Sequence, residues 1–124
     1  MALRDKMSAS AAQYLRPGEQ VQAVFGAQTT GPMMLVLVGS LIRLIINKYR
    51  MFVVTDQRIL VLDTGKWSLT KARGIVAELP RAARLGPATG LWYPIETGQE
   101  KLYVHRRFFK DIAAADAAGS PVTG

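Results

Sequence analysis

The sequence predicts an α+β fold, in which an antiparallel β-barrel or sandwich of about seven strands is capped by a C-terminal helix. Short runs rich in β-branched and aromatic residues follow one another from residue 19 to residue 107, separated by turn residues. No βαβ alternation interrupts them, and an amphipathic pattern at 107–118 closes the series. At 124 residues the chain fits one domain with a core of its own.

Turn signals bound the expected strands. In 19–29, apolar and polar residues alternate with the period of a half-buried strand. The runs 49–55 and 58–63 flank Asp56 and Gln57, which predicts an antiparallel hairpin with Asp56 as a turn residue whose side chain bonds its own backbone. The other expected strands are 67–72, 74–79, 91–96 and 101–107.

Amphipathic helices are expected near both ends of the chain. At the N-terminus, helical spacing places on one face Leu3, Met7, Ala11 and Tyr14. In the closing helix the same spacing joins Phe108, Ile112 and Ala115. The expected organisation is therefore an N-terminal amphipathic helix at 1–18, a barrel domain at 19–118 and a disordered tail at 119–124.

An apolar segment, 31–47, separates the first two expected strands and is predicted to be a helical insertion. Its stretch 33–46 has 14 residues, about 21 Å of helix, whereas the hydrocarbon core of a bilayer is about 30 Å thick. Arg43 is costly near mid-membrane but tolerated at the headgroups. A helix that is apolar nearly all round is also a poor surface helix for a water-soluble protein. Three interpretations stay open: a monotopic or re-entrant membrane anchor, a buried core or oligomer-interface helix, and a strained single span.

The composition excludes several kinds of chemistry. The chain has no cysteine and one histidine, which excludes disulfides, thiol nucleophiles and Cys or His metal clusters. His105 has no nucleophile or carboxylate at a useful spacing, and the nine carboxylates are dispersed. The N-terminal residues lack the zones of a secretory signal. We therefore expect a cytoplasmic protein that is not an enzyme and uses neither a metal nor another cofactor.

Positive charge is concentrated in the middle of the chain. The net charge is +7, and residues 43–84 hold nine basic side chains against three acidic ones. Such a surface suits an anionic partner, either phospholipid headgroups or nucleic acid, unless it is simply a solvated face. Trp67 lies among Lys66, Lys71 and Arg73, and tryptophan favours membrane interfaces and stacking surfaces.

Four stretches follow one another along the chain: "LRPGEQV" at 15–21, "VVTDQRILVLD" at 53–63, "LWYPI" at 91–95 and "YVHRRFFKDI" at 103–112. With them the chain resembles the bacterial pleckstrin-homology-like (PH-like) proteins, in particular small actinobacterial members in which an apolar segment separates the first two strands. The resemblance implies a fold without catalytic content. In lipid-binding eukaryotic relatives, the loop between the first two strands carries basic residues for inositol phosphates. Here the end of the apolar segment supplies Arg43, Lys48 and Arg50.

Together these features predict a PH-like binding or adaptor module at the inner face of the cell membrane. The residues expected to bind anionic lipid are Arg43, Lys48, Arg50, Lys66, Lys71 and Arg73. The residues expected to anchor the chain are Met33, Met34, Leu35, Leu37, Leu41, Ile42 and Trp67. The alternatives are a soluble protein-interaction module that oligomerises through the apolar helix or strand edges, and a single-strand nucleic-acid binder. Lipid is favoured if the apolar segment is exposed on the same side as the basic stretch, and nucleic acid is favoured if the segment is buried.

Overall fold

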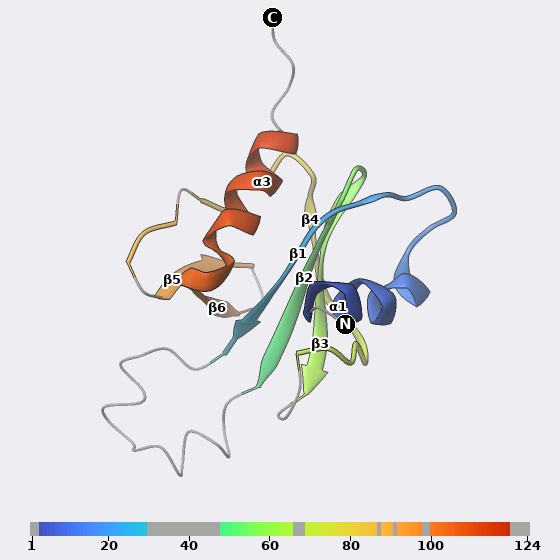
Figure 1. Cartoon of the computed structure of the whole chain (residues 1–124), viewed down its shortest axis with the longest axis horizontal. Coiled ribbons are helices and arrows are strands. Elements are labelled where there is room, and N and C mark those ends of the chain that lie inside the picture. Colours follow the sequence, from blue (N-terminus) through green and yellow to red (C-terminus); the bar gives the residue numbers. More distant parts are fainter. Residues whose placement is uncertain are drawn as a thin grey trace, which may run out of the picture.

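A computed structural model describes residues 3–29, 48–65, 69–86, 88–90, 92–97 and 100–119. Six antiparallel strands form one curled sheet, a half-barrel, in the order β4-β3-β2-β1-β6-β5 (Figure 1). The strands are β1 (Val21–Gln28), β2 (Tyr49–Thr55), β3 (Arg58–Gly65), β4 (Gly74–Pro80), β5 (Trp92–Glu96) and β6 (Lys101–His105). The helical elements are α1 (Leu3–Ala11), the 3-10 turns η1 (Ala12–Tyr14) and η2 (Arg106–Phe108), and α3 (Phe109–Gly119). The α+β fold with a C-terminal helix is confirmed.

The sheet of the described residues has six strands, so the expected count of seven is wrong. The expected strand 67–72 begins outside the described residues, and its described remainder forms bends and coil. Its backbone groups bond elsewhere, since the Ala72 N–H donates to Ser10 Oγ at 2.6 Å. The next residue, Arg73, donates its N–H to the Asp63 carbonyl oxygen at 2.7 Å. Tertiary contacts have overridden the local β-propensity.

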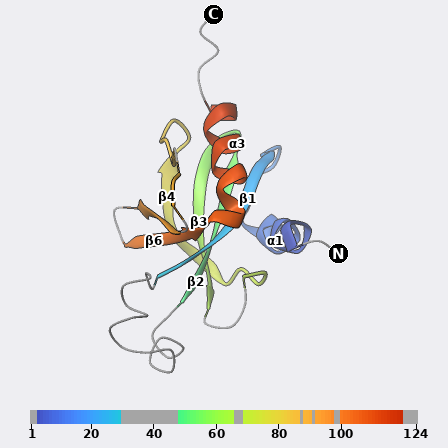
Figure 2. The same cartoon turned by 60° about the vertical axis from the view of Figure 1, so that its left-hand side comes forward.

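Side-chain alternation gives the sheet two apolar faces, and one helix covers each of them. In Figure 2, α3 runs upright along the sheet and α1 lies to its right. The core under α3 includes Phe25, Phe52, Val54, Ile59, Val61, Leu102, Val104, Phe108, Ile112 and Ala115. The core under α1 includes Met7, Ala11, Val24, Met51, Val53, Leu60 and Leu62. Both predicted helix faces therefore point into a core, with Leu3 and Tyr14 partly buried at its margin.

Strands β1 and β6 meet over a short distance. β1 pairs with β2 from Val21 to Gln28, whereas its pairing with β6 is at Gln28 opposite Tyr103. Away from that point the apolar residues of α3 share a core with Phe25 of β1. The junction of β1 and β6 thus lies close to one end of the half-barrel.

Candidate functional site

The two ends of the apolar segment meet at one point of the sheet. The Thr29 N–H donates to the Lys48 carbonyl oxygen at 2.9 Å, and the Lys48 N–H donates to Thr29 Oγ1 at 3.0 Å. The predicted helical insertion at 31–47 lies outside the described residues, so the membrane anchor, the core or interface helix and the single span all stay predictions. In the part of the chain that the structure describes, no helix is long and apolar enough to cross a membrane.

Three strand ends lie side by side at this point (Figure 1). Gln28 of β1 pairs with Tyr49 of β2, and Tyr49 pairs with Gly65 of β3. Gly65 has a φ of +83°, the left-handed conformation that glycine adopts without strain as a chain leaves a strand. The segment 30–47 and the connection that follows Gly65 therefore attach at the same end of the half-barrel. We name this end, defined by Gln28, Thr29, Lys48, Tyr49 and Gly65, the root end.

Lys48, Lys71 and Arg73 are predicted lipid-binding residues that the structure shows to be exposed. Lys48 belongs to the root end. Arg73 lies there too, because its Nη1 atom is 2.8 Å from the place that a Cβ on Gly65 would occupy. The predicted residues that fall outside the described ranges are Arg43, Lys66, Met33, Met34, Leu35, Leu37, Leu41, Ile42 and Trp67.

Arg50, the remaining predicted lipid ligand, points into the protein. Its side chain is 9% exposed, with Nη1 at 2.9 Å from Asp63 Oδ1 and Nε at 2.7 Å from Glu100 Oε1. Both carboxylates compete with any external anion for the guanidinium. Removing such a partly buried charge would leave its two partners unbalanced. This geometry favours a structural role for Arg50 in joining β2, β3 and the turn before β6.

Aromatic side chains gather on the α1 face of the sheet beside the root end. Trp92 of β5 lies opposite His105 of β6, and their rings meet edge to face with centroids 4.9 Å apart. Tyr103 shares this face with His105, because Leu102 and Val104, which alternate with them along β6, belong to the core under α3. Tyr49 of β2 lies on the same face, two residues before Met51 of the core under α1. We name Tyr49, Trp92, Tyr103 and His105 the aromatic patch; all four are partly exposed.

A hollow of about 40 Å³ opens between the aromatic patch and β1. Gly26, Leu69, Arg107 and Phe108 contribute to its lining. A Cβ at Gly26 would stand 2.9 Å from both methyl carbons of Leu69, so the glycine lets the connection between β3 and β4 lie against β1. Small-molecule pockets usually hold about 300–1,000 Å³. The hollow is therefore a shallow surface depression that is too small to enclose a substrate.

The surroundings of the aromatic patch are positively charged. Arg107 is exposed and lines the hollow, and its guanidinium lies 4.7 Å from the centroid of the Phe108 ring. Arg106 and Lys110, which are close to Arg107 along the chain, are exposed as well. The nearby carboxylates are paired within the protein: Glu96 with Lys101, Glu100 with Arg50, and Asp111 with Arg4. Among the described residues that line the hollow, none is an Asp or Glu. A surface of this kind attracts anions.

His105 has a role in the backbone that accounts for its position. Its Nδ1 atom accepts the Arg107 N–H at 3.1 Å and caps η2. In a neutral ring this bond leaves the proton on Nε2. Within the described ranges, no group of three or more His, Cys, Asp or Glu side chains lies close enough together to hold a metal ion.

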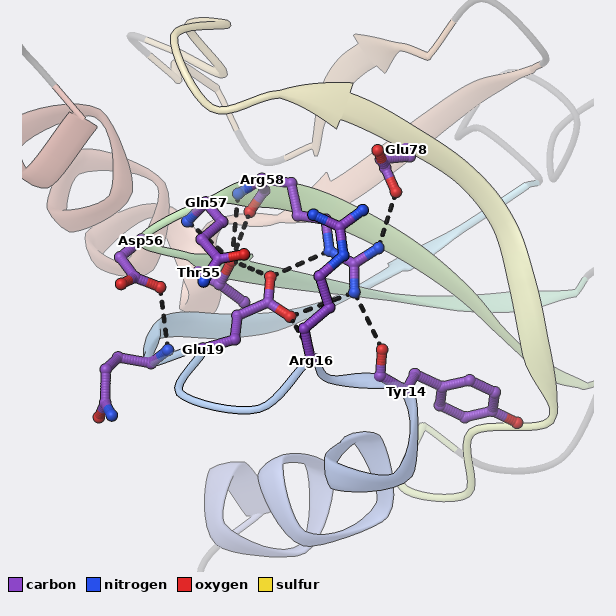
Figure 3. A network of polar contacts seen from close by, with 9 residues as sticks. Tyr14, Arg16, Glu19, Thr55, Asp56, Gln57, Arg58 and Glu78 are labelled. Atoms are coloured by element: carbon purple, nitrogen blue, oxygen red, sulfur yellow. Dashed lines mark hydrogen bonds and ion pairs between the residues drawn. The ribbon is translucent and has the colours of Figure 1, made fainter.

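The polar network in Figure 3 lies at the opposite end of β2 and β3 from the root end. The side chain of Glu19 is 0% exposed, and its Oε2 atom accepts from Arg58 Nε at 3.0 Å and from Thr55 Oγ1 at 2.6 Å. Arg58 also donates to Glu78 Oε1 at 2.8 Å and to the Tyr14 carbonyl oxygen at 3.0 Å. The hydrogen bond from Arg58 is the largest cause that lowers the pKa of Glu19 to about 2.

We name the network of Glu19, Thr55 and Arg58 the latch. Its role is structural. It ties the connection before β1 to the β2–β3 hairpin, whose two-residue tip at Asp56 and Gln57 is confirmed. The side chain of Asp56 accepts the Gln20 N–H at 2.9 Å, so the prediction that it bonds its own backbone is wrong. Thr55 Oγ1 takes that local role. It accepts the N–H groups of Gln57 and Arg58, two and three residues further along the chain, at 3.1 Å each.

Sequence reasoning missed the aromatic patch as a unit and placed the positive charge elsewhere. The signal was present in the period of the expected strands, because alternation puts Tyr103 and His105 on one face. What the sequence could not supply is the pairing of β5 with β6, which brings Trp92 to His105, and the turn of η2, which brings Arg107 back to the same place. No family model, no curated protein and no solved structure matches this chain.

Proposed function

We propose that the protein is a non-enzymatic, PH-like binding module that attaches to the inner face of the cell membrane through its root end. In this proposal the apolar segment enters the headgroup region, and exposed basic residues contact anionic lipid. The rest of the half-barrel stays free to hold a protein partner, which would make the module an adaptor.

One observation carries the proposal: the hydrogen-bonded pair Thr29 and Lys48 attaches the apolar segment at the end of the sheet where exposed basic residues lie. Lys48 and Arg73 are both at this end, and the chain leaves β3 there toward Lys66 and Trp67. The attachment of the apolar segment beside exposed cations supports lipid as the anionic partner in this proposal.

The two parts of this attachment act through different physics. Removing apolar area from water contributes about 25 cal/mol per Å² and depends little on salt. Each basic residue near an anionic surface contributes about 1 kcal/mol, and its effect is screened beyond a Debye length of about 10 Å at 0.1 M salt. Substitutions in the two parts should therefore give different salt dependence.

Vesicle flotation tests the proposal. Wild-type protein should float with vesicles of phosphatidylglycerol and phosphatidylcholine at low salt. Leu37→Asp combined with Leu41→Asp should release the protein at every salt concentration. Lys48→Gln combined with Arg73→Gln should weaken binding to anionic vesicles by about 30-fold at low salt and flatten its salt dependence.

A matched control removes the same charge from the other end of the half-barrel. Arg16 and Arg84 are exposed. Arg16 bonds Glu19 through its N–H, and Arg84 follows the turn after Pro80, which pairs with Arg58, so Arg16→Gln combined with Arg84→Gln should bind almost as well as wild type. Equal losses in both double variants would point to nonspecific attraction by net charge. Wild-type protein that fails to float with anionic vesicles at low salt, together with an aspartate pair that unfolds, would refute membrane attachment and make 30–47 part of a core.

A soluble interaction module is the second candidate, because β4 is an edge strand with an exposed apolar residue. Ile75 is 49% exposed on this strand. Pro80 at the end of β4 and Pro94 within β5 limit pairing at the two edges of the sheet. Concentration-dependent dimerisation that Ile75→Lys abolishes would favour this candidate.

A further inference from the structure

We infer that the aromatic patch is the surface that rests on the lipid headgroups, with Trp92 and Tyr103 at the level of the interface and Arg107 among the phosphates. This inference rests on the proposed function and adds to it the orientation of the domain on the membrane. It names residues on β5 and β6 that the charge pattern of the sequence does not suggest.

The position of the patch is the first argument. Tyr49 belongs to both the patch and the root end, and it pairs with Gln28, which in turn pairs with Tyr103. The patch is thus continuous with the place where the apolar segment attaches. A domain held at its root end has this surface close to the bilayer.

The chemistry of the patch is the second argument. Tyrosine and tryptophan are favoured at membrane interfaces because one end of each ring is apolar and the other is polar. Trp92, Tyr49 and Tyr103 are partly exposed here, whereas Phe25 and Phe52 fill the core. The four residues of the patch therefore include the amphipathic aromatics that an interface selects.

The charge of the patch is the third argument. Arg107 is exposed and lines the hollow beside the patch, and the hollow has no Asp or Glu among its described lining residues. Glu100, the carboxylate closest along the chain to β6, is already paired with Arg50. An anionic headgroup layer complements this surface, and a hollow of about 40 Å³ suits shallow contact with such a layer.

Tryptophan fluorescence tests the inference directly, because the chain has two tryptophans. Trp67→Phe leaves Trp92 as the single reporter and keeps an aromatic ring at position 67. Its emission should shift to shorter wavelength when phosphatidylglycerol and phosphatidylcholine vesicles are added in excess. Lipids brominated near the headgroup should quench it more strongly than lipids brominated near the end of the acyl chain.

A matched pair of substitutions tests the contribution of the patch to affinity. Tyr103→Thr keeps a good strand former and removes the ring, and losing about 40–60 Å² of apolar contact corresponds to about five- to tenfold weaker vesicle binding. Val21→Thr is the control, because Val21 is 37% exposed at the far end of β1. It should bind as wild type does.

The outcomes separate this inference from the proposed function. If the protein floats with vesicles but Trp92 is neither shifted nor quenched, another surface faces the membrane and the inference is wrong while the proposed function stands. If wild-type protein does not float, both are wrong. If Trp92 responds to single-stranded oligonucleotide and not to vesicles, the patch is a base-stacking surface and the inference is again wrong. The quenching measurement leaves the patch unaltered, so it decides the matter even if Tyr103→Thr does not fold.

Discussion

Glu19→Gln should destabilise the protein strongly at neutral pH and much less in acid. The carboxylate of Glu19 is fully buried and accepts four hydrogen bonds, two from Arg58, one from Thr55 and one from the Arg16 N–H. Glutamine has nearly the same shape but carries no charge. Its side-chain N–H groups would face the donors of Arg58 and Thr55, which need an acceptor. Arg58, itself 9% exposed, would lose its buried counter-ion and keep only Glu78.

The size of the effect follows from the pKa of Glu19, which the folded protein lowers from 4.5 to about 2. Each step of one in pKa corresponds to about 1.36 kcal/mol, so the ionised form contributes about 3 kcal/mol to the free energy of unfolding. Because the folded pKa lies below the unfolded one, this contribution is complete well above pH 4.5. It is lost as the pH falls from about 4.5 toward 2, and less than half is left at about pH 3.

Urea unfolding followed by far-UV circular dichroism, at several pH values between 7 and 3, measures this difference. Glu19→Gln should lower the free energy of unfolding by about 3 kcal/mol at pH 7, and its deficit should shrink as the pH falls. Glu78→Gln is the matched control, since it removes a carboxylate from the same arginine at a side chain that is 49% exposed. Its loss should stay below about 1 kcal/mol.

Two results would refute this reasoning about the latch. A loss below about 1 kcal/mol for Glu19→Gln at pH 7 would mean that the buried ion pair adds nothing beyond an exposed one. If the deficit of Glu19→Gln were as large at pH 3 as at pH 7, the substitution would act through packing and not through charge. A charge effect has to shrink in acid, because the wild type itself loses much of the stabilisation by ionised Glu19 there.

Three further substitutions test the packing and the turns. His105→Ala should lower the free energy of unfolding by about 1 kcal/mol because it removes the cap of η2, and His105→Asn should restore part of it in the same urea assay. Gly65→Ala should cost about 1–3 kcal/mol, since φ is +83° and the new Cβ would approach the Arg73 guanidinium; an unchanged unfolding midpoint would contradict the strain. Phe25→Ala should cost about 3–5 kcal/mol because Phe25 is 0% exposed and stacks on Phe52 at 4.8 Å, and thermal unfolding would show it as a large fall in midpoint temperature.

Local periodicity was enough to predict the elements whose buried face follows from the spacing of their own apolar residues. The closing helix is an example, since the spacing of Phe108, Ile112 and Ala115 identifies the face that is buried. The hairpin at Thr55–Arg58 is another, because two apolar runs flank a short polar step. The strand expected at 67–72 failed for the complementary reason. Its residue Ala72 bonds to α1, the next residue, Arg73, bonds to β3, and no local pattern records those contacts.

The candidate site depends more heavily on contacts between distant residues, and the sequence predicted less of it. Arg50 looked like one cation among nine in the basic stretch, but Asp63 and Glu100 neutralise it, and the second of these is 50 residues away. Glu19 and Arg58, 39 residues apart, form the latch in the same way. Counting charges along the chain thus overestimates the free positive charge where strand pairing brings acids to bases.

The latch and the root end lie at opposite ends of β2 and β3, and this separation bears on how attachment and folding are related. Thr55 and Arg58 begin and end the hairpin tip, whereas Tyr49 and Gly65 mark the other ends of the same strands. Both apolar cores lie between the two ends. The latch fixes the hairpin tip through buried charges, and beside the root end Arg50 is paired with Asp63 and Glu100. Neither of these ion-pair networks includes Lys48 or Arg73. Lys48 and Arg73 are exposed at the root end, and they are the charges that the proposed contact with an anionic surface would use.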